Sequence, residues 1–214
     1  MLNQLHRTDP EHGTVETQRA HYANGVLNGY SRWDKKVKYS FSGGRIEKEE
    51  SYRGYYQNGK RHGKGKYSWK NKVDKESGYY DGEWSQGEYH GQGKLHRGSK
   101  KYSTTYRGTF VKGTKEGKGY LHISRYRKSS NTRRWSDNYF KGLFKAGYCV
   151  DGSETWNSTF EVDSTRYRKA KTIYSKGNFL GTFKNQYKHN GRGSSSRDKK
   201  KTYFDYKNGK QIKN

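Results

Sequence analysis

The chain has 214 residues and a formal net charge of +26, from 46 Lys and Arg against 20 Asp and Glu. Leu, Ile, Val and Phe together contribute only 26 residues, which by itself favours disorder, yet 16% of the residues are aromatic and only one is proline. This composition excludes a membrane span and a thick aliphatic core, and the single cysteine, Cys149, excludes an intramolecular disulfide.

Residues 1–20 precede any recognisable repeat and are predicted to form an N-terminal tail. They lack the apolar run of a signal peptide and an N-terminal lipidation motif. Together with the lone cysteine, this favours an intracellular protein, either cytoplasmic or peripheral at a membrane. Residues 21–51 are predicted to form a divergent first repeat. The second half of the repeat unit matches at Tyr22, Gly25, Gly29 and Trp33, and a degenerate first half matches at Tyr39, Phe41 and Gly44.

Residues 52–123 contain three copies of one pattern, aligned without gaps. Each copy reads aromatic-x-Gly-x-aromatic-x-x-Gly-x-x-x-Gly-x-Gly, and the coincidence of so many fixed positions indicates internal repetition. The glycines that we expect to be structural are Gly54, Gly59, Gly63, Gly65, Gly82, Gly87, Gly91, Gly93, Gly108, Gly113, Gly117 and Gly119.

The spacing within each copy is typical of a β-hairpin. Residues two apart in a strand share a face, so Tyr52, Gly54 and Tyr56 are predicted to project together. The Asn58-Gly59 pair favours a tight turn, because both residues tolerate positive φ angles. Each mid-strand glycine is then expected to leave a slot for an aromatic ring of a neighbouring strand, which replaces the missing aliphatic core.

This pattern resembles the MORN repeat (membrane occupation and recognition nexus), whose units read Tyr-x-Gly-x-Trp-x-x-Gly-x-x-x-Gly-x-Gly. The resemblance is strong over residues 52–121 and looser over 20–210. It implies an all-β fold, namely an elongated single-layer antiparallel sheet of successive β-hairpins. It also implies a non-catalytic role in scaffolding, protein contact or association with membrane surfaces.

Residues 124–193 are predicted to hold two divergent repeats with long basic insertions, and residues 194–214 a basic loop and a C-terminal half-repeat. Equivalent glycines lie at positions 54, 82, 108, 142 and 181, so the steps lengthen towards the C-terminus and indicate inserted loops between hairpins. If these loops leave one edge of the sheet, their charges form a stripe that binds polyanions without sequence preference. The alternative is that the charge only keeps a tyrosine-rich sheet in solution. The residues expected to bind polyanions are Lys100, Lys101, Arg125, Arg127, Lys128, Arg133, Arg134, Arg166, Arg168, Lys169, Lys199, Lys200 and Lys201.

The aromatic positions of the repeats are predicted to form a stripe along one face of the sheet. The first expected role of this stripe is to form the core. Because a single-layer sheet leaves one side of its core at the surface, the stripe is also expected to offer a groove to an extended peptide or a partner's helix. The stripe residues are Tyr52, Tyr56, Tyr80, Trp84, Tyr106, Phe110, Phe140, Phe144, Phe179 and Phe183.

Two segments resemble ligand-binding sites but lack a residue or a spacing that such sites require. The segment from Gly54 to Lys60 has the glycine and lysine spacing of a P-loop, but Arg61 takes the place of the Ser or Thr that binds Mg²⁺. His62 and His90 recur at one repeat position, which places them about 10 Å apart, too far to share a metal ion.

No residue constellation in the sequence supports catalysis. Cys149 has no recognisable His–Asp arrangement around it. The acidic run of Glu47, Glu49 and Glu50 is expected to pair with basic segments of the same chain or of an adjacent copy. We therefore expect no catalytic residues, no cofactor, no metal and no small-molecule substrate.

The function that the sequence favours is a non-enzymatic scaffold or adaptor that binds a protein partner through its aromatic groove and basic loops. One alternative is a peripheral membrane protein that binds anionic phospholipids, and another is a structural component that binds nucleic acid or belongs to a virion. The open edges of the predicted sheet also offer a route to self-association.

Overall fold

The computed structural model of the chain describes residues 2–9, 13–41, 44–163, 171–184, 187–198 and 200–212. The chain divides into two compact units. The first unit comprises Met1–Lys100 and Thr109–Thr114, and the second comprises Lys101–Gly108 and Lys115–Asn214. Both units are built of strands, and the described residues include no helix that is long and apolar enough to cross a membrane.

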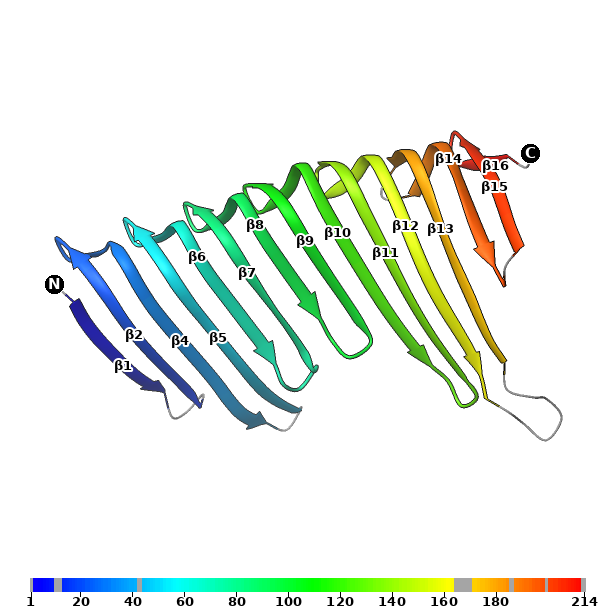
Figure 1. The fold of residues 1–214 in the computed structure, drawn as a ribbon. Coiled ribbons are helices and arrows are strands. Elements are labelled where there is room, and N and C mark those ends of the chain that lie inside the picture. The colour runs from blue at the N-terminus through cyan, green and yellow to red at the C-terminus, as the bar shows by residue number, and fades with distance from the viewer. Residues whose placement is uncertain are drawn as a thin grey trace. The chain divides into compact units, whose positions relative to one another are not determined.

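In the first unit, each long strand pairs with the next one along the chain (Figure 1). The pairing order is β1-β2-β4-β5-β6-β7-β8, all antiparallel, and the short β3 pairs with β2. The strands are β1 (Leu2–Asp9), β2 (Thr14–Ala23), β3 (Val26–Leu27), β4 (Gly29–Phe41), β5 (Gly44–Gln57), β6 (Lys60–Asn71), β7 (Glu76–Ser85) and β8 (Glu88–Gly98).

The second unit follows the same rule, with pairing from β10 through β16 in sequence order, again antiparallel. The strand β9 (Tyr102–Val111) contributes residues to both units. The remaining strands are β10 (Thr114–Lys128), β11 (Thr132–Lys145), β12 (Tyr148–Val162), β13 (Lys171–Lys184), β14 (Tyr187–Arg197), β15 (Lys200–Lys207) and β16 (Lys210–Ile212). The predicted all-β class of consecutive antiparallel hairpins is thus confirmed in each unit.

The N-terminal segment differs from the expected tail, because residues 2–9 and 14–23 form the strands β1 and β2. The Thr- and Val-containing start of β2 favours extended backbone, and β4 supplies its hydrogen-bonding partner. A side-chain contact supports this pairing, in which Trp33 Nε1 donates to Glu16 Oε1 at 2.5 Å. No ring-over-glycine pattern marks these strands in the sequence.

The tight turns have the geometry that the Asn-Gly pair predicts, with positive φ at both positions. In the β5–β6 turn, φ is 50° at Asn58 and 75° at Gly59, which is typical of a two-residue hairpin loop. The glycine N–H of each turn also bonds to the preceding hairpin, as Gly87 donates to the Arg61 carbonyl at 2.9 Å. Successive turns within a unit therefore lie along the same edge of its sheet (Figure 1). The same φ pattern occurs at Gln86–Gly87, Lys112–Gly113, Ala146–Gly147 and Asn208–Gly209.

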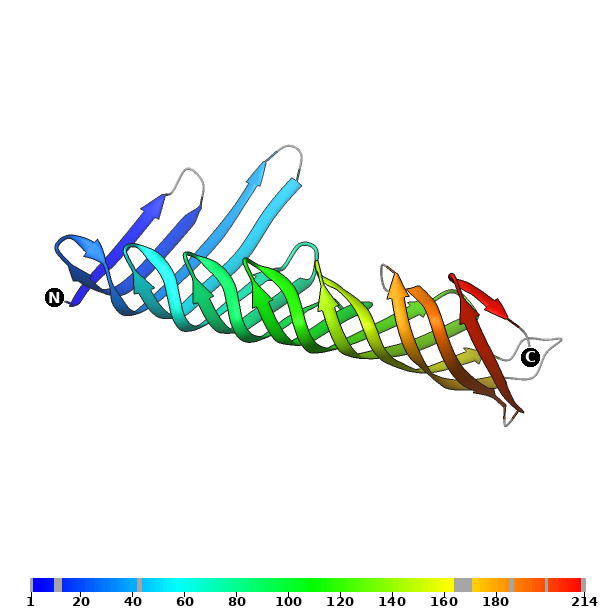
Figure 2. The same ribbon diagram turned by 90° about the horizontal axis from the view of Figure 1, so that it is seen from above.

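A β-bulge follows the tight turn, and the strands coil strongly towards this end (Figure 2). On β6, Gly63 and Lys64 have no partner on β5, and the ladder resumes where Gly54 faces Gly65. Gly63 has a φ of 62°, a left-handed conformation that favours glycine. Between β11 and β12, only Val150 is extra. This one-residue difference explains why the second half of the divergent repeats is shifted along the sequence.

The basic insertion around residues 125–134 is mostly strand and not the expected loop, which corrects that prediction for this segment. β10 continues to Lys128 and β11 begins at Thr132, so the basic segments 125–128 and 133–134 lie within paired strands. The inserted residues lengthen the hairpins at the edge away from the tight turns (Figure 1). The physical reason is that successive side chains of a strand point to opposite faces, so neighbouring basic residues can be separated while their backbone stays paired. The basic side chains are therefore divided between the two faces of the sheet.

The two faces of each sheet differ in burial, and we name them by the stripe residues. The core face carries the stripe, and the open face is the other one. On the core face, Gly82 faces Gly93 across the β7–β8 ladder. The Tyr80 ring lies over Gly93, where an added Cβ would come within 2.6 Å of the ring atom Cε2. Rings over glycines are therefore confirmed. The same packing places Tyr52 over Gly65 and Tyr106 over Gly119.

Candidate interaction surfaces

The stripe residues pack edge to face, so that the first aromatic residue of one repeat contacts the second aromatic residue of the next. Such pairs contribute about 0.5–1.5 kcal/mol each beyond their buried area, and they connect successive repeats. The distances between ring centroids are 5.3 Å for Tyr52–Trp84, 5.2 Å for Tyr80–Phe110, 4.9 Å for Tyr106–Phe144 and 5.7 Å for Phe140–Phe183.

Burial supports the core role of the stripe. All of its residues except Tyr56 are buried, with exposed fractions between 0% and 5%. Little ring surface is therefore left for a partner. That the stripe also forms a binding groove stays a prediction.

The tyrosine hydroxyls of the stripe hold the bulges in place. Burial raises the pKa of Tyr52 and Tyr80 above the ordinary value, and raises the pKa of Tyr106 to about 12, so these hydroxyls remain protonated donors. Tyr80 Oη donates to the Glu83 carbonyl at 2.7 Å, with the His90 carbonyl 3.1 Å away. These contacts give the stripe tyrosines a structural role that phenylalanine would not supply.

A cation sits among the rings of the core face, which the sequence reasoning missed. The Arg61 guanidinium lies 4.6 to 5.9 Å from the ring centroids of Trp33, Tyr52, Tyr67 and Trp84. Arg61 follows the first glycine of its repeat by seven positions. The equivalent residues Lys115 and Lys188 also lie over core-face rings, at 5.6 Å from Tyr106 and 4.3 Å from Trp156. The recurrence of a basic residue at this repeat position is the sequence pattern from which the contact between cation and rings could have been predicted.

Arg61→Met is expected to lower the free energy of unfolding by about 1–2 kcal/mol, because it keeps an apolar stem but removes the cation from the surrounding rings. Urea unfolding followed by circular dichroism measures the change. Arg53→Met is the control, since Arg53 is exposed on the open face and its replacement is expected to stay within about 0.5 kcal/mol. Indistinguishable effects of the two variants would contradict a stabilising role for the Arg61 contacts.

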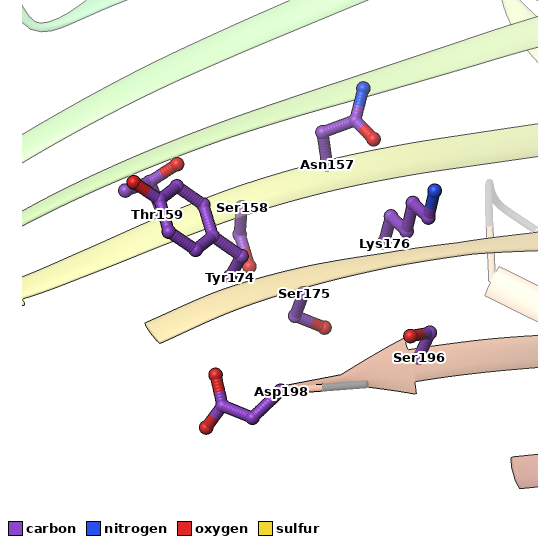
Figure 3. A pocket seen from close by; sticks show the side chains of 8 residues that line it. All are labelled: Asn157, Ser158, Thr159, Tyr174, Ser175, Lys176, Ser196 and Asp198. Carbon is purple, nitrogen blue, oxygen red and sulfur yellow. The ribbon is translucent and has the colours of Figure 1, made fainter. Parts of the chain in front are cut away.

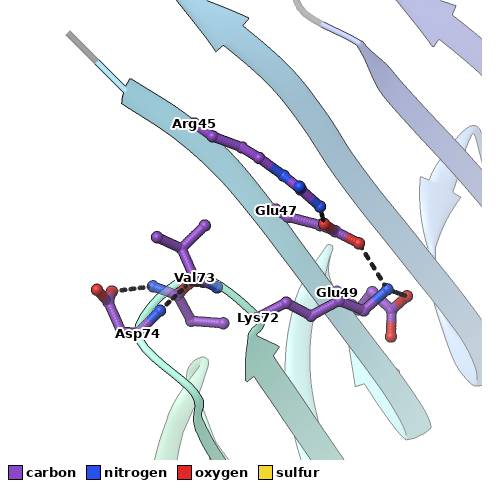
Figure 4. A network of polar contacts seen from close by, with 7 residues as sticks. Arg45, Glu47, Glu49, Lys72, Val73 and Asp74 are labelled. Carbon is purple, nitrogen blue, oxygen red and sulfur yellow. Dashed lines mark hydrogen bonds and ion pairs between the residues drawn. The ribbon is translucent and has the colours of Figure 1, made fainter.

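The acidic run pairs within its own unit, as one of the predicted options has it. Lys72 Nζ lies 2.9 Å from Glu47 Oε1 and 2.8 Å from Glu49 Oε1, and Arg45 forms a further ion pair with Glu47 (Figure 4). The hydrogen bond from Lys72 lowers the pKa of Glu49. Glu50 faces Lys35 across the β4–β5 ladder. The Glu47 and Glu49 carboxylates are thus engaged in local ion pairs.

The basic residues expected to bind polyanions are distributed over several elements. Lys100 and Lys101 lie in the connection between β8 and β9, and Lys200 and Lys201 begin β15. The β10 and β11 ends hold Arg125, Arg127, Lys128, Arg133 and Arg134. Arg166, Arg168, Lys169 and Lys199 lie outside the described residues.

The open face carries large exposed side chains that the sequence reasoning did not single out. Tyr174 and Leu180 on β13 are 65% and 67% exposed, and Tyr203 on β15 is 63% exposed. In the first unit, Tyr30 and Tyr55 pack edge to face on the open face, with ring centroids 5.6 Å apart. The sequence could have predicted this exposure from the alternation of side chains along a strand. Tyr174 and Leu180 lie an odd number of positions from the stripe residue Phe179, so they point to the opposite face.

A cavity of about 710 Å³ lies on the second unit, and Tyr174 is one of the residues that line it (Figure 3). Its walls are mainly hydroxyl and amide side chains of β12 and β13, together with Lys176 and Asp198. The Tyr174 ring stands beside Thr159, its partner across the ladder (Figure 3). The cavity thus offers hydrogen-bonding groups next to an exposed ring, an arrangement suited to contact with another molecule.

Within the described part of the chain, no group of three or more His, Cys, Asp or Glu side chains is placed to hold a metal ion. Cys149 is buried, and its Sγ lies 3.6 Å from the Asp151 carbonyl. Burial raises the pKa of this thiol to about 11, which keeps it protonated and a poor nucleophile.

Tight turns on one edge, rings over paired glycines and ring contacts between hairpins define a β-hairpin repeat protein. The family model of the MORN repeat matches residues 52–72, 80–100 and 106–124, so the chain carries three MORN repeats, as the resemblance predicts. MORN repeats are a non-catalytic repeat type and are known in scaffold and membrane-binding proteins. A comparison with curated proteins gives no significant match.

Proposed function

We propose that the protein is a non-enzymatic scaffold or adaptor that binds a protein partner through aromatic and basic side chains of its hairpin repeats. The observation that carries this proposal is the exposure of large side chains on the open face, above all Tyr174, Leu180 and Tyr203. Large exposed side chains on one face of the sheet give a partner protein several anchor points. Because the stripe residues are almost fully buried, the open face provides the contact surface in this proposal.

Affinity capture from native lysate, followed by direct binding to the purified captured protein, tests the proposal. The test variant replaces Tyr174, Leu180 and Tyr203 with serine, and the control variant carries Thr172→Ser and Thr182→Ser on the same face. We expect a defined protein that binds the wild type and the control, and that binds the test variant about tenfold more weakly or less. Capture of no protein, or equal binding by both variants, would contradict the proposal.

A peripheral membrane protein is the alternative function, and the open-face ends of β10 and β11 favour it. Tyr126 and Trp135 lie there with ring centroids 5.2 Å apart, beside the exposed Lys128. Aromatic rings next to basic residues suit the interface of an anionic bilayer. Flotation with phosphatidylserine vesicles, compared with neutral vesicles, tests this alternative. Binding that requires the anionic lipid and is lost at high salt supports it, whereas absence of flotation contradicts it.

A further inference from the structure

On the core face of the second unit, the stripe gives way to arginines at the edge away from the tight turns. Arg125 and Arg127 lie on β10, and Arg134 on β11 stands directly opposite Arg127. On β12, Trp156 and Ser158 continue this region, and these side chains line a cavity of about 440 Å³. We propose that this cavity binds a compact anion that carries two or more phosphate groups.

The charge distribution between the two faces supports this site. On the open face, Arg133 lies 3.1 Å from the Asp163 carboxylate and 3.7 Å from the Glu161 carboxylate. The three cavity arginines make no ion pair with any described residue. Adjacent residues of one strand therefore differ sharply, since Arg133 forms ion pairs with two carboxylates and Arg134 forms none with any residue that the structure describes.

The buried carboxylate of the core face does not compensate the cavity arginines. Glu154 Oε2 lies 2.7 Å from Lys188 Nζ, and Glu154 Oε1 accepts a hydrogen bond from Asn138 Nδ2 at 2.7 Å. Both oxygens are thus engaged, and the cavity retains a positive potential.

The opposition of Arg127 and Arg134 costs stability in the absence of a ligand. Directly opposed residues of antiparallel strands have Cβ atoms about 4.5–5.5 Å apart, where like charges destabilise the ladder. The β4–β5 ladder shows the favourable arrangement, with Lys35 opposite Glu50. An anion bound between the two guanidinium groups removes the repulsion, so a binding site explains why two arginines face each other here.

The chemistry of the lining selects phosphate groups. Guanidinium groups present pairs of N–H donors that match phosphate oxygens bidentately. The Arg125 guanidinium lies 5.6 Å from the Tyr102 ring centroid, a cation–π distance that holds this side chain beside the cavity. The Ser136 and Ser158 hydroxyls offer further donors to the ligand.

The size of the site favours a compact ligand over a polymer. The cavity is within the range of about 300–1,000 Å³ that small-molecule sites occupy. The Cβ atoms of Arg127 and Arg134 are about 5 Å apart across the ladder, and those of Arg125 and Arg127 are about 7 Å apart along β10, so the three side chains start close enough together to contact one small anion. Trp156 forms a firm wall, since its ring packs against Gly177, where an added Cβ would lie 2.1 Å from Trp156 Cζ2.

Calorimetric titration of the full chain with inorganic tripolyphosphate tests the site. We expect saturable binding that Arg127→Gln and Arg134→Gln each weaken about tenfold or more. The matched control is Arg133→Gln, which removes the same charge from the neighbouring open-face position and is expected to change the affinity less than about threefold. In the absence of ligand, Arg134→Gln is also expected to unfold at the same or a higher urea concentration than the wild type, because it relieves the repulsion.

Absence of saturable binding, or equal weakening by all three variants, would overturn the proposal in favour of unspecific charge attraction. Binding of a single-stranded oligonucleotide in place of tripolyphosphate would overturn it as well. Competition by vesicles that contain a phosphatidylinositol bisphosphate identifies a lipid as the carrier of the phosphate groups, and lack of competition identifies a free solute. The scaffold proposal is tested separately, because its contact surface is the open face.

Discussion

Gly82→Val is expected to lower the free energy of unfolding of the first unit by about 3 kcal/mol or more, at the upper end of the cost of overpacking. A Cβ at Gly82 would lie 2.5 Å from Gly93 Cα and 2.6 Å from the Gln92 carbonyl oxygen. Both atoms belong to the opposing backbone, which cannot rotate away as a side chain can. The ladder between β7 and β8 must therefore open, and urea unfolding followed by circular dichroism measures the cost.

Glu83→Val is the matched control for this prediction, since it places the same side chain on the next residue of the same strand. Glu83 lies on the open face, where its Oε1 accepts a hydrogen bond from the Gln92 N–H at 3.2 Å. Loss of that bond is expected to cost about 1 kcal/mol. If the two variants lost equal stability, the assignment of Gly82 to the close approach between backbones would be wrong.

The part of the fold that the sequence predicts best is the part whose packing repeats locally. In residues 52–123, the first aromatic ring of each repeat rests on a glycine of the adjoining strand, as Tyr80 rests on Gly93. Aromatic and glycine positions therefore recur together in the sequence. The strands β1 and β2 pair through their backbones without this packing, so no side-chain pattern announces them.

The exposure of the stripe is harder to predict, because it depends on contacts between repeats. A single-layer sheet suggests half-exposed rings, yet Phe110 has no exposed surface. Edge contacts from the preceding repeat and cations such as Arg61 cover the rings, and both come from residues distant in the repeat unit. Their geometry follows only from the register of the strands.

The basic segments show why charge clusters in a sequence do not map directly onto one surface. Arg133 and Arg134 are adjacent in the chain, but strand alternation sends them to opposite faces. Arg133 meets two carboxylates, whereas Arg134 faces Arg127. A sequence analysis that expects loops cannot predict this difference, because side chains in a loop do not alternate regularly between two faces.

Tyr80→Ala is expected to lower the free energy of unfolding by about 3–5 kcal/mol, the usual cost of removing a fully buried aromatic ring. Tyr80 has no exposed surface, and its ring contacts Trp84, Tyr89 and Phe110 at centroid distances of 5.2, 3.8 and 5.2 Å. The truncation also uncovers the backbone at Gly93. Urea unfolding monitored by tryptophan fluorescence measures the effect, because the environment of Trp84 reports on the same contacts.

Tyr79→Ala is the matched control, since Tyr79 precedes Tyr80 but lies on the open face. Its ring stacks on His96 at 5.6 Å, with Lys66 and Lys94 nearby, and this partly exposed cluster is expected to contribute about 1 kcal/mol. Tyr80→Phe separates the ring from its hydroxyl and is expected to cost about 1 kcal/mol through the lost bond to the Glu83 carbonyl. A cost for Tyr79→Ala as large as that for Tyr80→Ala would show that both faces stabilise the sheet equally. The rings over glycines would then not be the core that compensates for the shortage of aliphatic residues.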